Sequence, residues 1–289
     1  MVMSFLLRGV VAPAAILVVL TLIGNRFWRL KDERQADPLP ALACGIALTV
    51  GFIRMFKWPG VPPTEHWQWI LVAIWGATVA AFLASWMTRT HILRLIVWLV
   101  FASATAWLIH PTWDDYAGER WWLIGGVAAI IFANLEATSH LNRERHGLSP
   151  LFMVTIGMIL TSILVVHANQ AKFAQVCGSI AAVLGFLFLI CLRLPKREPI
   201  SGAMAIPSIM IPVMAFLAFY FYSDGETFPT EFALGSVTPL MVAVVTLCPM
   251  GRLKGWKRFV VAQILCIIPV VVGIVMLVKS SGAEESYAY

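Results

Sequence analysis

One acidic residue stands well inside an apolar stretch of the sequence, and it is the first candidate for chemistry. Glu136 lies about one helical turn before the end of the segment Trp121–Thr138, with Asn134 two residues before it and His140 four residues after it. A carboxylate is costly inside a bilayer and commonly marks a path for protons, ions or substrates. The alternative is that Glu136 snorkels to the membrane interface or pairs with a nearby base, namely Arg89, Arg94 or Arg143. We predict that Glu136 faces the protein interior rather than lipid.

Prolines in the last three apolar stretches are the second candidate. Pro212, Pro239 and Pro269 each fall near the middle of an apolar segment. A proline in a helix removes one backbone donor and frees a carbonyl, and transporters often build substrate sites from helices broken at mid-membrane. Proline is also common in membrane helices without such a role. We predict that these segments meet at a small polar cavity, and that residues 235–239 depart from regular helix and offer the hydroxyls of Ser236 and Thr238.

Polar and aromatic residues in two predicted outer loops are the third candidate, with His66 in one loop and His110, Trp113, Asp114 and Asp115 in the other. Aromatic faces beside carboxylates and imidazoles can bind a sugar, a quinone head group or a cation. The H-x4-D spacing from His110 to Asp115 is also used by glycerolipid acyltransferases, where the carboxylate orients a histidine that deprotonates an alcohol. That family needs a soluble-type domain, for which the connectors here are too short, so we expect solvated or interfacial histidines.

The sequence predicts neither a metal site nor a cofactor site. No short-range pair of ligands supports a metal, and no phosphate-binding loop or hydrolase motif is present. The five cysteines lie in or beside apolar stretches without a CxxC spacing, which indicates inert thiols.

The composition determines the kind of scaffold that must position these residues. Of the 289 residues, 60% are apolar and only 12% are charged, about half the charged share of a soluble domain. The apolar residues form long unbroken runs, which excludes a soluble globular enzyme, a disordered protein and a coiled coil. We predict an all-α, polytopic transmembrane helix bundle in the lipid bilayer, with residues 1–289 forming one integral membrane domain.

Ten apolar segments approach the length of about 20 residues that a membrane span needs. They are Leu6–Gly24, Leu39–Ile53, Trp69–Met87, Ile92–Ile109, Trp121–Thr138, Pro150–Val166, Ala174–Leu192, Ile200–Phe221, Phe232–Leu247 and Phe259–Val278. The third contains small residues at four-residue spacing, which predicts close packing against a neighbour: Ala73, Ala77 and Ala81. Ten spans would permit an inverted repeat with halves 1–148 and 149–289.

Basic residues alternate from one connector to the next. Fifteen of the 21 Lys and Arg residues lie in connectors after odd-numbered segments, including Arg94. Because cytoplasmic loops are enriched in Lys and Arg, we predict that both termini lie outside the cytoplasm. The net charge of +6 reflects this bias rather than nucleic-acid binding. A cell inner (plasma) membrane location is favoured because no asparagine lies in an N-x-S/T sequon.

Three classes of function fit this scaffold. The favoured class is a permease or exporter for a small solute, with its site at Glu136, Asn134 and the broken helices. Its length and span count are similar to those of the drug/metabolite transporter type, whose termini are both cytoplasmic, so the resemblance concerns architecture alone. The alternatives are a non-catalytic subunit or scaffold that binds other membrane proteins or further copies of itself, and an integral-membrane enzyme acting on a lipid-linked or quinone substrate.

Overall fold

The computed structural model describes residues 6–27, 39–60, 63, 66–86, 91–110, 120–143, 149–168, 170–193, 203–222, 230–247 and 256–286. This part of the chain is helical apart from short connecting stretches and contains no strand. Apolar runs form helices in a membrane because a helix satisfies its backbone hydrogen bonds within the segment. The all-α class predicted from the sequence is confirmed.

The described residues form eleven α-helices, whose bounds follow the apolar segments closely. They are α2 (Ala12–Phe27), α3 (Leu39–Phe56), α4 (Trp69–Trp86), α5 (His91–Ile109), α6 (Arg120–Arg143), α7 (Ser149–His167), α8 (Ala171–Arg193), α10 (Ala205–Tyr222), α11 (Thr230–Ser236), α12 (Thr238–Leu247) and α13 (Trp256–Ser286). A π-helical turn, η1 (Leu6–Val11), precedes α2, and a 3₁₀ turn, η2 (His66–Gln68), precedes α4. The ninth apolar segment is the pair α11 and α12.

Several of these helices are suited to crossing a membrane. Within the described residues, α5, α6, α7, α8 and α13 are long and apolar enough, and the α11–α12 pair makes a sixth span if it is counted as one. The apolar stretches of α2, α3, α4 and α10 are shorter. The structure therefore supports a membrane-embedded helical protein, while ten spans and outside termini remain predictions.

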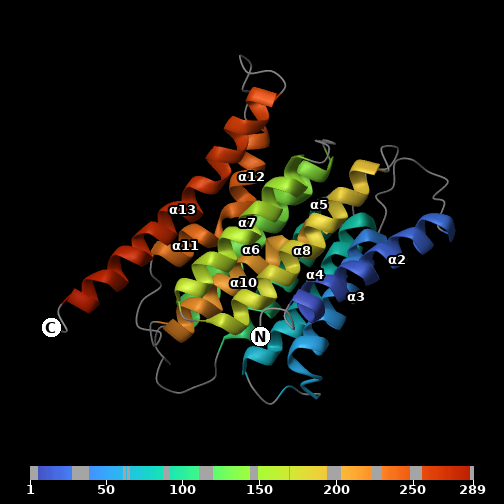
Figure 1. Cartoon of the computed structure of the whole chain (residues 1–289). Helices are drawn as coiled ribbons and strands as arrows, with labels where there is room; N and C mark the ends of the chain where they lie inside the picture. Colours follow the sequence, from blue (N-terminus) through green and yellow to red (C-terminus); the bar gives the residue numbers. More distant parts are fainter. Residues whose placement is uncertain are drawn as a thin grey trace.

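Helix α10 lies in the middle of the bundle (Figure 1). Every residue from 203 to 220 is buried, and α10 packs against α4, α6, α7 and α11. A helix that is apolar all round is expected in such an interior position. In contrast, α13 packs against α7, α11 and α12 at one edge of the bundle, with α2 and α3 at the opposite edge. Polar groups on α10 are consequently surrounded by protein.

Small residues let neighbouring helices approach closely. Helix α4 buries its row of alanines, as the four-residue spacing predicted: Ala73, Ala77 and Ala81. A methyl group added at Gly157 of α7 would overlap the Thr238 side chain of α12. One added at Gly273 of α13 would lie 2.5 Å from the backbone oxygen of Glu231 in α11. The α11–α12 pair is therefore held between α7 and α13 by contacts that need glycine.

Candidate functional site

The helix breaks at Val237, between α11 and α12, which are bent by 52°. This confirms the predicted departure from regular helix at residues 235–239. Pro239 explains it, because its ring has no N–H for the carbonyl of Gly235 and clashes with that carbonyl in a straight helix. The Thr238 hydroxyl donates to the Gly235 oxygen at 3.0 Å instead. The carbonyl that Pro239 frees is thus satisfied within its own segment.

The side-chain amide of Asn134 fills the next gap in this helix. In an unbroken helix the N–H of Leu240 would donate to the carbonyl of Ser236, four residues earlier. Here the Leu240 N–H donates to Oδ1 of Asn134 at 3.1 Å, and Nδ2 of Asn134 donates to the Ser236 oxygen at 2.9 Å. Asn134 lies on α6 and is fully buried. Its amide therefore acts as an inserted peptide group that satisfies both backbone groups in the bent conformation.

The same amide also reaches a carbonyl that a second proline frees. Pro212 of α10 has no N–H for the carbonyl of Ser208, four residues earlier. Nδ2 of Asn134 donates to this Ser208 oxygen at 3.4 Å. The amide nitrogen thus donates hydrogen bonds to carbonyls of α10 and α11, while the amide oxygen accepts one from α12. One side chain on α6 joins three other helices at two gaps in the backbone hydrogen bonding.

Two buried hydroxyls lie beside this amide. Oγ1 of Thr138 and Oγ of Ser208 are 2.9 Å apart. Thr138 Oγ1 also lies 2.8 Å from the backbone oxygen of Asn134, and Ser208 Oγ lies 2.7 Å from that of Met204. Thr138 Oγ1 also lies 3.2 Å from the backbone oxygen of Leu135. Each hydroxyl carries one proton, so these four contacts share two protons. We call this group the Asn134 cluster: Asn134, Thr138, Ser208, Ser236 and Leu240.

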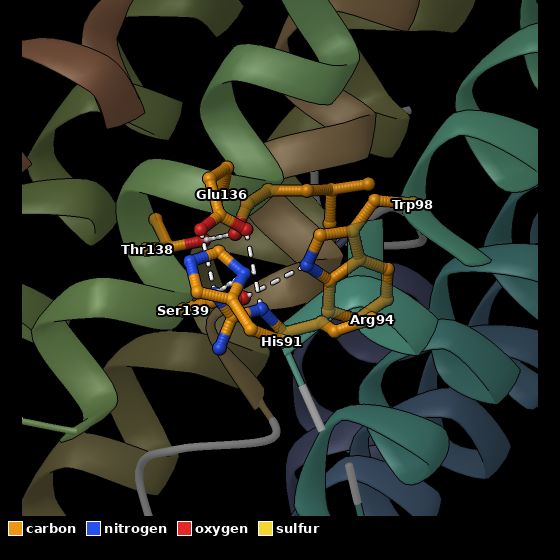
Figure 2. A network of polar contacts seen from close by, with 7 residues as sticks. His91, Arg94, Trp98, Glu136, Thr138 and Ser139 are labelled. Carbon is orange, nitrogen blue, oxygen red and sulfur yellow. Dashed lines mark hydrogen bonds and ion pairs between the residues drawn. The ribbon is translucent and has the colours of Figure 1, made fainter. Parts of the chain in front are cut away.

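Glu136 of α6 pairs with Arg94 of α5 (Figure 2). Nη2 of Arg94 lies 2.6 Å from Oε1 of Glu136, and its Nε lies 3.2 Å from Oε2. The Arg94 side chain is 3% exposed and that of Glu136 24%. Nδ1 of His91 lies 3.4 Å from the same Nη2. The structure thus shows the alternative in which Glu136 pairs with a base. The pattern of basic residues placed Arg94 in a connector, but Arg94 lies within α5.

A second polar contact continues along the interface between α5 and α6. Nε1 of Trp98, which is fully buried, donates to Oγ of Ser139 at 3.1 Å (Figure 2). Trp98 lies one turn after Arg94, and Ser139 lies nearly one turn after Glu136. Sequence reasoning missed Trp98, because its partner Ser139 lies 41 residues away on another helix and no local spacing marks the contact.

The structure divides the predicted site residues between two sides of α6. The junction of α6, α10 and α11–α12 brings together five of them: Asn134, Pro212, Ser236, Thr238 and Pro239. Glu136 pairs with Arg94 on the α5 side, and a solute site that includes both Glu136 and Asn134 remains a prediction. Pro269 is half-buried on α13, which packs against α7, α11 and α12. A cavity shared by all these segments remains a prediction.

One candidate from the outer loops, His110, is placed differently from the expectation. His110 follows α5 and is 3% exposed, with its ring centre 5.9 Å from that of Phe216 and 6.4 Å from that of Tyr220 in α10. It is packed inside the bundle rather than interfacial, because the end of α5 turns it toward α10. The side chains of four other candidates lie outside the described residues: His66, Trp113, Asp114 and Asp115.

No protein-family model, curated protein or solved structure matches the chain. Within the described part of the chain, no three His, Cys, Asp or Glu side chains are grouped to hold a metal ion. The described cysteines are free and buried, as the sequence indicated: Cys44, Cys177, Cys191 and Cys266. What the Asn134 cluster offers chemically is hydrogen bonding from an amide, three hydroxyls and backbone groups, all of them uncharged; the Ser236 hydroxyl donates to the Phe232 oxygen of its own helix at 2.8 Å.

Proposed function

We propose that this protein is a permease or exporter for a small solute, and that the solute binds at the α11–α12 break within the Asn134 cluster. The observation that carries the proposal is that the broken helix is completed by a side chain of α6 instead of by its own backbone. In the core of a bilayer, backbone groups at a break need polar partners. Transporters place such breaks at their solute sites, where the exposed backbone groups bind the solute.

The position of the break supports this proposal. Helix α11 has seven residues and α12 has ten. At 1.5 Å per residue, the break lies about 10 Å from one end of the segment and about 15 Å from the other. A solute bound there is close to the middle of a span, where a small change in tilt on either side opens a path to one face of the membrane.

The low net free energy of the hydrogen bonds at the break also supports the permease proposal. A side-chain hydrogen bond has a net value of about 1 kcal/mol because it replaces a comparable bond, so a solute can take the place of Asn134 at little net cost. The Arg94–Glu136 pair is different, because separating buried ions costs more. Helices α5 and α6 are therefore expected to move as one unit against α10, α11 and α12.

The proposal is tested by purifying the protein and screening small solutes for thermal stabilisation, using amino acids, amines, sugars and nucleosides. Solutes that stabilise it are then measured for exchange in proteoliposomes. We expect at least one solute to exchange with the wild type and not with Asn134→Leu. Trp98→Phe is the matched control, because it removes one buried hydrogen bond on the α5 side of α6. A panel without stabilisation or exchange would contradict the proposal and favour the scaffold.

A further inference from the structure

We infer that the gap filled by Asn134 is a recognition slot for a primary carboxamide, and that the transported solute carries such a group. In the structure Asn134 acts as an internal surrogate for the solute. The inference rests on the proposed permease function and specifies its substrate class. Its basis is the match between one side chain and three backbone groups of other helices.

The match uses every donor of the carboxamide. A primary carboxamide has two N–H protons and a carbonyl oxygen. The oxygens of Ser236 and Ser208 lie 2.9 and 3.4 Å from Nδ2 of Asn134 and take one proton each. The N–H of Leu240 donates to Oδ1 at 3.1 Å. A solute that replaces Asn134 must therefore bring two donors and one acceptor in the same arrangement.

Other functional groups leave part of this slot unsatisfied. A carboxylate has no proton and would set a negative charge against two carbonyl oxygens. An ester or a dialkylated amide offers an acceptor without donors, and an ammonium group leaves the Leu240 N–H without an acceptor. Each unsatisfied buried polar group is penalised. The Arg94–Glu136 pair is internally neutral and lies on the α5 side of α6, so it does not favour a charged solute at the slot.

The neighbouring hydroxyls provide hydrogen-bond acceptors for the Asn134 amide when a solute displaces it. Thr138 and Ser208 share two protons among four contacts. The two hydroxyl oxygens have four lone pairs, and at most one of these accepts a hydrogen bond between the two hydroxyls, so the pair can accept an additional N–H donor. When the solute carboxamide occupies the slot, the Asn134 amide turns toward Thr138 and Ser208 and donates there.

The first experiment tests the chemistry of the slot. Asn134→Ala is titrated with propionamide, N,N-dimethylpropionamide and sodium propionate while thermal unfolding is followed. We expect propionamide alone to raise the unfolding temperature of the variant. The matched control is Leu135→Ala, which opens an apolar space at the next, fully buried residue of α6 and should gain nothing specific from propionamide. Equal effects of the three compounds on Asn134→Ala, or an equal gain in the control, would overturn the inference.

The second experiment uses the wild type, so it gives a result even if Asn134→Ala does not fold. Proteoliposomes are tested with pairs that differ only in carboxamide and carboxylate: glutamine with glutamate, and asparagine with aspartate. In parallel, the Leu240 backbone amide resonance is followed during titration with propionamide and with propionate. We expect the carboxamides to shift this resonance, and to compete with a transported solute at least about tenfold more strongly than the carboxylates.

The outcomes separate this inference from the permease proposal. If a solute is exchanged but carboxylates compete as well as carboxamides, the substrate class is wrong and the permease stands. If propionamide rescues Asn134→Ala but leaves the wild-type Leu240 resonance unchanged, Asn134 is a fixed clamp and the inference is overturned. If no solute is exchanged, the permease proposal itself fails.

Discussion

Removing one partner of the Arg94–Glu136 pair is expected to destabilise the protein strongly. Glu136→Met leaves the Arg94 guanidinium, whose side chain is 3% exposed, without its two carboxylate contacts. Breaking a buried ion pair costs about 3–5 kcal/mol, and an arginine in a membrane helix costs about 2.5–3.5 kcal/mol on insertion scales. Because Glu136 is 24% exposed, we take the lower end and expect a loss of about 3 kcal/mol.

The partner variants distinguish lost ion pairing from lost packing. Arg94→Met leaves a better-solvated carboxylate, so we expect a smaller loss of about 1–2 kcal/mol. The double variant of Arg94→Met with Glu136→Met leaves no unpaired charge in this contact and should lie within about 1 kcal/mol of the wild type. The coupling energy, which is the sum of the two single losses minus the loss in the double variant, is then about 3–6 kcal/mol.

The assay is reversible unfolding in mixed micelles, in which the denaturing detergent fraction is raised and helicity is followed by circular dichroism. The free energy of unfolding is obtained for the wild type, both single variants and the double variant. A coupling energy below about 0.5 kcal/mol, the value of many exposed ion pairs, would refute the argument that this pair is buried and holds α5 to α6.

The same unfolding assay tests two further predictions, and a fusion experiment tests a third. Asn134→Leu leaves the three backbone groups that Asn134 contacts unsatisfied and should cost at least about 3 kcal/mol. The control Thr161→Val loses one hydrogen bond to its own helix and should cost about 1 kcal/mol. Equal losses in the two variants would contradict the role of Asn134. Gly273→Ala should cost about 1–3 kcal/mol, because the added methyl group meets the backbone of Glu231. The control Gly125→Ala adds a methyl group that meets nothing within 4 Å, so it should be neutral or stabilising by up to about 1 kcal/mol. A reporter fused after Tyr289 should read as extracytoplasmic, and a cytoplasmic reading would contradict the orientation derived from the basic residues.

The sequence predicted those features of the fold that depend on local chemistry. Long apolar runs became helices, because a run of such residues has few other ways to satisfy its backbone in lipid. The break at residues 235–239 was also predictable, because Pro239 removes a hydrogen bond from its own helix wherever that helix packs.

The role of Asn134 was not predictable in this way. Its backbone partners at Ser208 and Ser236 lie 74 and 102 residues later in the chain. The sequence placed Asn134 two residues from Glu136, a step of about 200° on a helix, so opposite directions of the two side chains were predictable. The helices that cover each of these two sides were not. A single sequence contains no information about which side of α6 each helix covers.

The positions of two other side chains, Arg94 and His110, also could not be predicted from the sequence. Arg94 was counted among the bases of a connector, because a charge beside an apolar segment usually marks its end. Its partner Glu136 is 42 residues away, and the pairing lets the charge lie inside α5. His110 was expected at the interface, but packing against Phe216 and Tyr220 of α10 buries it.

The most direct test of the central claim is water access to the Asn134 cluster. The five native cysteines are replaced, and single cysteines are introduced by Ser208→Cys in the cluster and by Ser179→Cys in α8, where both native serines are buried. Intact membranes are then treated with a small charged thiol reagent that cannot cross lipid. We expect Ser208→Cys to be labelled and Ser179→Cys to stay unlabelled, because solute exchange opens the α11–α12 break to water. Equal protection of the two cysteines until the protein is denatured would contradict a solute site at this break.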